Sequence, residues 1–212
     1  MNTGEPEATR GRGRPRNDAI DEAAVEAALD LLVEGGVRAV TVEAVARRAG
    51  TTPPAIYRRW PNAEDLLWTA MRSVALSAAK RSHGGPPYST DGLPFDQALR
   101  RTMQRCAEIY ADRRLAASYL AVSTAAHIDP ATKAGFERFQ TALNEPMLAL
   151  VQPAADAAGL PARMLADLVV GTIVYQIGIR GAAPTPAEID ALAALITAGC
   201  RAMAAERGVA PP

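Results

Sequence analysis

Arginine is the residue type through which this chain could bind a charged partner, and arginines cluster in two short stretches of the sequence. The first, RGRGRPR, places four arginines within residues 10–16. The second runs over residues 36–62 and holds five arginines against one acid, a local net charge of +4. A guanidinium group offers a planar fork of donors that fits phosphates and guanine edges. Both stretches therefore predict contact with a polyanion such as DNA.

Patterns typical of catalysis do not occur in the sequence. His83 and His127 are the only histidines, and there is no zinc-protease, nucleophile-elbow or phosphate-loop motif. The two cysteines, Cys106 and Cys200, lie far apart and form no CxxC pair, which favours a reducing interior over a disulfide-stabilised fold. We therefore predict that the protein is not an enzyme, and we expect no catalytic residue, no metal site and no cofactor.

The arginines of the second stretch need short helices to position them, and the sequence predicts three. A first helix is expected over Asp18–Glu34, because apolar residues recur there with helical period and a Gly-Gly pair follows as its C-cap. Thr41 caps a second helix that ends at Gly50, and Thr51–Pro54 opens a third. Two short helices joined by a tight turn form a helix-turn-helix, which places its last helix in the DNA major groove.

Every later segment also has helical period, so we predict an all-α fold of about nine helices. The expected helices are one beginning at residue 62, then 95–111, 112–127, one from 130 that Pro146 and Pro153 break or kink, 161–181, and one from 185.

The overall charge excludes a wholesale polycation, since 23 Lys and Arg residues balance 23 Asp and Glu residues. No uncharged stretch is long enough to span a bilayer, and no apolar signal sequence follows the N-terminus. We therefore expect a soluble protein of the cytoplasm without a membrane partner.

Residues 41–67, TVEAVARRAGTTPPAIYRRWPNAEDLL, resemble the N-terminal signature of the TetR family of bacterial transcriptional regulators. The similar features are the Ala-Gly turn, the Ile-Tyr pair, the aromatic Trp60 and the Leu-Leu pair after the next cap. The resemblance covers residues 18–67 and implies a homodimer, a palindromic DNA operator, and repression relieved by a small-molecule effector. Two positions depart from the family's pattern, since Ala63 stands where a phosphate-binding lysine is common and Pro54 where glycine is common.

The residues and the resemblance together predict a DNA-binding set. Its members are Arg12, Arg14, Arg16, Thr41, Arg48, Thr51, Thr52, Pro53, Ala55, Tyr57 and Arg58. The three arm arginines resemble an AT-hook, because an extended arginine-rich strand fits the narrow A·T minor groove. Two plainer interpretations stay open: a flexible basic leader that only adds phosphate attraction, and a solvated basic face on an ordinary three-helix unit.

Two further sets are expected in the C-terminal part. The dimer interface is predicted at Leu168, Thr172, Ile173, Ile189, Leu192 and Ile196, on two strongly apolar helices that could instead be this domain's own core. Ligand-binding side chains are predicted at Met103, Cys106, Tyr110, Tyr119, Phe139, Met147 and Tyr175, which could equally be plain core. Because that set is uncharged, it favours an apolar or weakly polar effector over an anion.

The predicted organisation is a disordered arm at 1–17, a DNA-binding domain at 18–65, and an effector-binding and dimerisation domain at 66–212. We interpret the chain as a homodimeric DNA-binding repressor that a small, largely apolar effector releases from its operator. The first alternative is an effector-independent architectural protein that binds A·T-rich DNA through its arm. The second is a helical module whose basic face meets an acidic protein.

Overall fold

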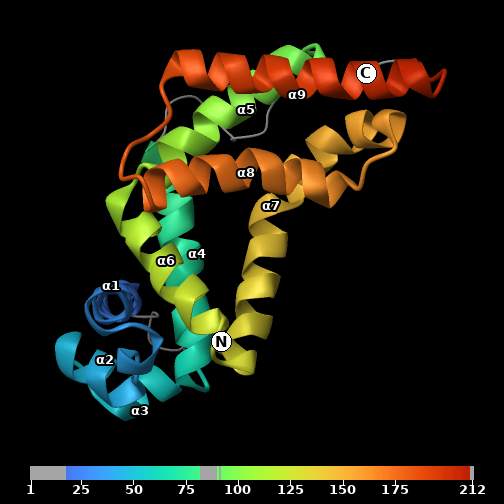
Figure 1. Ribbon diagram of the computed structural model, residues 1–212. Coiled ribbons are helices and arrows are strands. Elements are labelled where there is room, and N and C mark those ends of the chain that lie inside the picture. Colours follow the sequence, from blue (N-terminus) through green and yellow to red (C-terminus); the bar gives the residue numbers. More distant parts are fainter. Residues whose placement is uncertain (1–17, 82–89, 91, 211–212) are drawn as a thin grey trace, which may run out of the picture.

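The computed structural model describes residues 18–81, 90 and 92–210, and the described residues fold into α-helices without any strand (Figure 1). The helices are α1 (Asp18–Gly35), α2 (Val42–Arg48), α3 (Pro53–Tyr57), α4 (Ala63–Arg81), α5 (Phe95–Tyr110), α6 (Arg113–Ala126), α7 (Pro130–Ala158), α8 (Ala162–Gly178) and α9 (Pro186–Glu206), with a short 3₁₀-helix η1 (Val37–Ala39). The predicted all-α fold of about nine helices is confirmed. The predicted arm lies outside the described residues.

Side-chain caps start several helices where the sequence predicts them. The Thr41 hydroxyl accepts a hydrogen bond from the backbone N–H of Ala44 at 3.1 Å, and Asn62 accepts one from the N–H of Asp65 at 2.8 Å. Thr185 and Glu188 form a complete capping box at the start of α9. Each cap satisfies backbone donors that the first helical turn leaves without a partner.

Helix α7 is kinked rather than broken, which is one of the two outcomes that its prolines predict. Pro146 and Pro153 both lie inside one continuous helix that ends at Gly159, which has a left-handed φ of 71°. The helix bends in its C-terminal half (Figure 1), as expected where prolines remove backbone hydrogen bonds. Packing against α6, α8 and α9 holds the two halves as one element.

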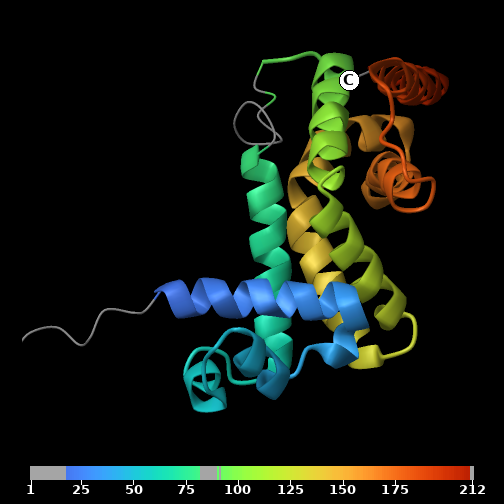
Figure 2. The ribbon, with the colours of Figure 1, turned by 90° about the vertical axis from the view of Figure 1, so that its left-hand side faces the viewer.

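The first three helices form a head that lies against the lower ends of α4 and α6. Figure 2 shows α1 crossing α4, with α2 and α3 beneath it, while α8 and α9 lie on the side of the molecule away from α4. The predicted domain boundary at 65/66 falls in the first turn of α4, which runs from the head into the C-terminal helices. A displacement of α4 would therefore move the head directly.

Two sets of fully buried side chains hold these parts together. In the head, Leu29, Leu32 and Ile56 are at most 1% exposed, and Leu66 of α4 closes the same core. A second set joins the helices α5, α6, α7 and α8; its members include Leu99, Met103, Leu115, Met147 and Ile173. Burying a side chain of this size contributes roughly 1.5–3 kcal/mol. Within the described residues, no helix combines the length and the apolar character that crossing a membrane requires.

Polar contacts fasten the head to the C-terminal helices. Arg114 at the start of α6 reaches α1, where it donates to the carbonyl oxygen of Glu26 at 3.1 Å and to the carboxylate of Asp30 at 2.8 Å. It also pairs with the Glu26 carboxylate. One guanidinium group thus joins α6 to two successive turns of α1.

Candidate nucleic-acid interface and adjoining cavity

The turn between α2 and α3 depends on Gly50. Its φ is +65°, a left-handed conformation that glycine adopts without steric cost, and the N–H of Thr51 returns to the carbonyl of Ala46 at 2.9 Å. Pro53 then occupies the first turn of α3, where its missing N–H removes no helical bond. Ile56 and Trp60 point into the core, so the opposite side of α3 faces outward.

The outward side of α3 carries most of the side chains that were predicted to meet DNA. Thr52 and Arg58 are exposed at the two ends of the helix, and Tyr57 is 49% exposed. The Thr52 side chain makes no capping hydrogen bond. The prediction that Ala55 meets DNA is wrong. Ala55 is only 5% exposed and packs inward, because it lies next to Ile56 on the side of α3 that meets the core. Exposed hydroxyl and guanidinium groups of this kind are suited to phosphates and base edges.

Helix α1 neutralises part of the basic character of this unit. Arg48 of α2 donates to Glu34 at 2.7 Å, and Arg59 pairs with Asp21 and also donates to the carbonyl of Ala55. The hydrogen bond to Arg48 lowers the pKa of Glu34, and the same bond raises the pKa of Arg48. Arg48 is therefore held by α1, although the sequence predicts it to meet DNA.

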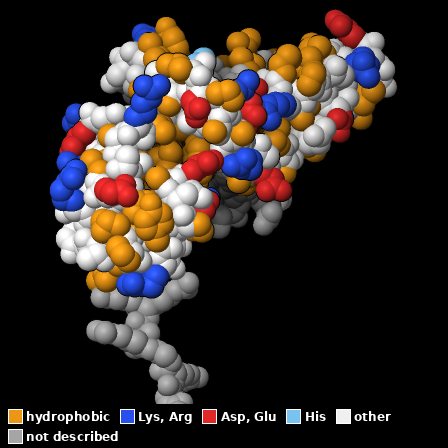
Figure 3. Space-filling view, turned by 90° about the horizontal axis from the view of Figure 1, so that it is seen from below, with side chains coloured by type: hydrophobic (Ala, Val, Ile, Leu, Met, Phe, Trp, Pro, Cys, Tyr) orange, Lys and Arg blue, Asp and Glu red, His pale blue; other side chains and the backbone are white. Residues whose placement is uncertain are grey.

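Three other arginines of this unit, Arg38, Arg47 and Arg58, are exposed and form no ion pair with any described residue. Viewed from below, the molecule shows cationic and acidic side chains interspersed with apolar ones (Figure 3). The candidate interface is therefore a small set of separate cations, of which Arg58 is the neighbour of Tyr57 in the sequence. Thr41 is exposed at the start of α2, and Thr51 and Pro53 are half-buried. The arm residues Arg12, Arg14 and Arg16 lie outside the described residues.

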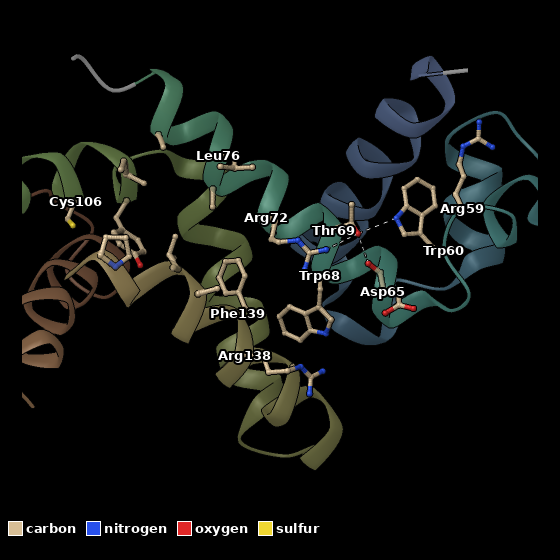
Figure 4. A pocket seen from close by; sticks show the side chains of 18 of the residues that line it. Arg59, Trp60, Asp65, Trp68, Thr69, Arg72, Leu76, Cys106, Arg138 and Phe139 are labelled. Atoms are coloured by element: carbon tan, nitrogen blue, oxygen red, sulfur yellow. Dashed lines mark hydrogen bonds between the residues drawn. The ribbon is translucent and has the colours of Figure 1, made fainter. Parts of the chain in front are cut away.

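A cavity of about 1120 Å³ adjoins this unit; it lies between α4, α5 and α7 and opens to solvent. It reaches the segment directly after α3, since Arg59, Trp60 and Pro61 line one end (Figure 4). The indole N–H of Trp60 donates to the Thr69 hydroxyl of α4 at 3.2 Å. One wall of the cavity is thereby hydrogen-bonded to the end of the helix-turn-helix.

The predicted ligand-binding residues divide into three groups in the structure. Cys106, Tyr110 and Phe139 line the cavity. Met103 and Met147 are fully buried behind its walls, and the Tyr119 ring packs edge-on against Tyr110 with ring centroids 5.8 Å apart. Tyr175 lies on the exposed side of α8, away from the cavity. It is the member of the set that the structure does not bring to this site.

Sequence reasoning missed the contribution of α4 to the cavity. Trp68, Thr69, Arg72 and Leu76 all line it, and Arg138 joins them from α7. Trp68 fits because Gly135 of α7 has no side chain; a β-carbon there would lie 2.3 Å from the indole ring. The spacing 68, 69, 72, 76 places these residues on one side of a helix, but only the position of α7 shows that this side faces a cavity.

The predicted dimer residues also divide. Ile173, Ile189 and Ile196 are buried within the single chain, Thr172 and Leu192 are half-buried, and Leu168 is 49% exposed. The buried isoleucines belong to the core, so they offer almost no surface to a partner. The outward side of α8 and α9 instead presents large apolar side chains; these are Met164, Leu168, Tyr175, Leu195 and Met203, followed by Ile179 at the end of α8.

Comparisons with known proteins agree with this arrangement. The family model for bacterial regulatory proteins of the tetR family matches residues 24–68. An uncharacterized HTH-type transcriptional regulator of Bacillus subtilis, YdeS, is 41% identical over 64 residues, which is 30% of this chain and 32% of that protein. This match therefore spans about a third of the relative's length.

Solved structures share the fold over nearly the whole chain. A protein of Pseudomonas aeruginosa PAO1 described as a transcriptional regulator superposes with a TM-score of 0.65 at 18% identity, covering 92% of this chain and 96% of that one. The regulator FadR of Bacillus subtilis in complex with stearoyl-CoA superposes with a TM-score of 0.64 at 16% identity, covering 84% and 98%.

The fold and the N-terminal match define a class: an all-helical fold with an N-terminal helix-turn-helix of the tetR type. Residues 24–68 of the chain match the family model for bacterial regulatory proteins of the tetR family, and the chain as a whole shares the fold of the solved structures compared above. The helix-turn-helix of this chain is therefore similar to the DNA-binding unit of that family.

Proposed function

We propose that this protein is a homodimeric transcriptional repressor of the cytoplasm that binds a palindromic operator on the nucleoid and is released by a small, largely apolar effector. The observation that carries this proposal is the outward side of α3, where Tyr57 and Arg58 are exposed beside the Gly50 turn. An exposed second helix of a helix-turn-helix is positioned to enter the major groove, with its side chains on base edges and phosphates.

The cavity supports regulation by an effector. The cavity is large enough for a drug-sized small molecule. Its lining extends from α5 to Trp60 and Pro61, which end the helix-turn-helix. An effector that binds the released conformation better than the DNA-bound one would shift the population towards release. The FadR neighbour was solved with stearoyl-CoA, so this fold accommodates ligands; at 16% identity, that name assigns no ligand to this chain.

The apolar outward side of α8 and α9 supports a homodimer. Leu168 and Leu195 are 49% and 70% exposed, and a β-carbon added at Gly171 or Gly199 would meet no atom within 4 Å. Large exposed apolar surfaces of this kind mark interfaces, and small residues let two helices approach closely. A twofold pairing of these helices would present two copies of α3 to half-sites about 34–36 Å or more apart.

DNA binding by α3 is tested on operator sequences selected from random duplexes. We expect Arg58→Ala to weaken operator binding by roughly 5- to 150-fold, since a good arginine–base contact contributes about 1–3 kcal/mol. Tyr57→Phe should lose about 2- to 10-fold, the contribution of one hydrogen bond. Arg101→Ala, which removes an exposed arginine of α5, is the matched control and should bind as the wild type does.

A salt series with operator and random duplex separates the proposal from its alternatives. We expect a specificity ratio of about 10³ or more. A ratio near one with steep salt dependence would instead indicate an architectural protein that binds through its arm, and no binding to either duplex would indicate a protein-binding module. Unchanged affinity in both the Tyr57 and the Arg58 variant would refute the proposed recognition helix.

The homodimer is tested by sedimentation. Leu195→Glu places a charge on the outward side of α9 and should yield folded monomers, because a dimer would have to bury that carboxylate. Ile196→Glu is the informative contrast: Ile196 is buried within the chain, so the same charge should unfold the protein. A Leu195→Glu protein that remains dimeric would place the interface elsewhere.

A further inference from the structure

The cavity has two chemically different ends. One end is apolar, lined by Leu76, Ala79, Ile109 and Leu143 together with the Cys106 thiol. Leu76 is 62% exposed although it lines a cavity, so a large apolar side chain there is left for a ligand to cover. Figure 4 shows Leu76 and Cys106 on one side and the arginines nearer to Trp60 on the other.

The other end is cationic. Three arginines line it, Arg59, Arg72 and Arg138, against a single lining acid, Asp65. Asp65 accepts a hydrogen bond from the side-chain amide of Asn62 at 3.1 Å, and among the described residues it forms no ion pair with Arg72 or Arg138. Asp21 and Glu64 lie against Arg59 and Arg138, so Arg72 is the lining arginine best placed to attract a negatively charged ligand group.

The three arginines are not equivalent. Arg59 is held by Asp21, and Arg138 lies 3.5 Å from Glu64. Arg72 donates to the Thr69 hydroxyl at 3.3 Å and forms no ion pair with any acid of the described residues. A guanidinium group carries five N–H donors, so Arg72 keeps most of its donors for another partner.

An apolar ligand that filled the cavity would remove water from Arg72. Withdrawing water from a cation without supplying an anion is costly, whereas a carboxylate placed on the guanidinium restores charge-assisted hydrogen bonds. A ligand that joins an apolar body to one anionic group satisfies both ends of the cavity together.

We propose that the effector consists of an apolar body and a single anionic group, in its simplest form a monocarboxylic acid, with the anion on Arg72 and the body along Leu76, Ile109 and Phe139. This inference rests on the proposed function, in which the cavity holds the effector. It reverses the expectation from sequence that the effector is not an anion, because Arg72 and Arg138 come to the cavity from the polar sides of their helices.

The bound anion would lie close to the DNA-binding unit. Arg72 and Trp60 both donate to the same acceptor, the Thr69 hydroxyl, which itself donates to the carbonyl of Asp65 at 2.8 Å. A carboxylate that draws the Arg72 guanidinium towards itself therefore changes the hydrogen bonding of the residue that ends the helix-turn-helix. The anionic group is thus the part of the effector nearest to the site of release.

The test compares probes that share an apolar body and differ in charge. The full-length protein is titrated with dodecanoate, dodecan-1-ol and dodecyltrimethylammonium, each below its micelle concentration, and tryptophan fluorescence is recorded. The chain contains only two tryptophans, Trp60 and Trp68, and both line the cavity, so the signal reports this site. We expect dodecanoate to bind about tenfold or more tightly than the alcohol, and the ammonium probe to bind most weakly.

Variants assign the preference to Arg72. Arg72→Gln should weaken dodecanoate binding about tenfold and leave dodecanol binding unchanged, whereas Arg101→Gln, the control at an exposed arginine outside the cavity, should change neither. Circular dichroism and thermal unfolding verify that both variants are folded, as expected for exposed side chains. Calorimetry with 4-phenylbutanoate and 4-phenylbutanol repeats the comparison with an aromatic body.

Equal affinities of acid and alcohol would overturn the inference, as would an Arg72→Gln protein that keeps the preference for the acid, or a failure of both acids to bind. Because no DNA is present, these outcomes are independent of operator release. An acid that binds through Arg72 but leaves the operator occupied would refute the proposed regulation and leave the present inference standing.

Discussion

Replacing Arg114 by alanine should loosen the attachment of the DNA-binding head to the C-terminal helices. The Arg114 side chain is 34% exposed and joins α6 to the Glu26 and Asp30 carboxylates and to the Glu26 carbonyl of α1. Both acids are more than half exposed, so solvent screens these contacts. Exposed ion pairs contribute about 0.2–1 kcal/mol each. Two such pairs and one backbone hydrogen bond together give about 1–2 kcal/mol.

Urea unfolding followed by circular dichroism measures this loss. Lys133→Ala is the matched control, because Lys133 pairs only with Glu137 within α7, and its removal should cost less than about 0.5 kcal/mol. The difference between Arg114→Ala and wild type should shrink in 1 M salt, where the screening length falls to about 3 Å.

A double-mutant cycle isolates the contact between Arg114 and Asp30. We expect a coupling free energy of about 0.5–1 kcal/mol between Arg114→Ala and Asp30→Asn, since the two groups share a hydrogen bond of 2.8 Å. Strict additivity of the two substitutions would refute the reasoning. Under the proposed function, Arg114→Ala should also respond less to an effector in an operator-release assay. The substitution removes the contacts of Arg114 with Glu26 and Asp30, which join α6 to α1.

Two further perturbations test local features of the fold. Gly50→Ala should lower the free energy of unfolding by about 1–2 kcal/mol, because the position has a φ of +65° and the added β-carbon meets no atom within 4 Å, so the cost is conformational alone; a loss below about 0.5 kcal/mol in urea unfolding would contradict this. For Asp112, partial burial acts to raise the pKa, but hydrogen bonds from backbone N–H groups of α6 and from Arg81 outweigh it and lower the pKa. Its carboxylate therefore stabilises the fold above the pKa of the unfolded state, about 3.9, and that contribution is lost as the pH falls through the folded pKa. The stability difference between wild type and Asp112→Asn should accordingly be full at pH 7 and vanish under strongly acidic conditions, and a difference independent of pH would contradict it.

Local signals in the sequence predicted most helix starts and the helix-turn-helix. The caps at Thr41, Asn62 and Thr185 and the glycine at position 50 act within about four residues, so their meaning does not depend on distant parts of the chain. The same locality explains why Tyr57 and Arg58 were predicted on the outward side of α3: Ile56 and Trp60 had already defined the inward side.

Tertiary packing decided what those signals left open. Helix α8 is apolar on nearly all sides, so nothing in its sequence separates the buried Ile173 from the exposed Leu168; the position of α5 and α7 does. From the sequence alone, Arg48 is expected to contact DNA. In the structure, the packing of α1 places Glu34 against it as an ion-pair partner. The cationic end of the cavity exists because α7 lies beside α4 and places Arg138 near Arg72. Helix periodicity tells which residues share a side, whereas only the arrangement of neighbouring helices determines what that side faces.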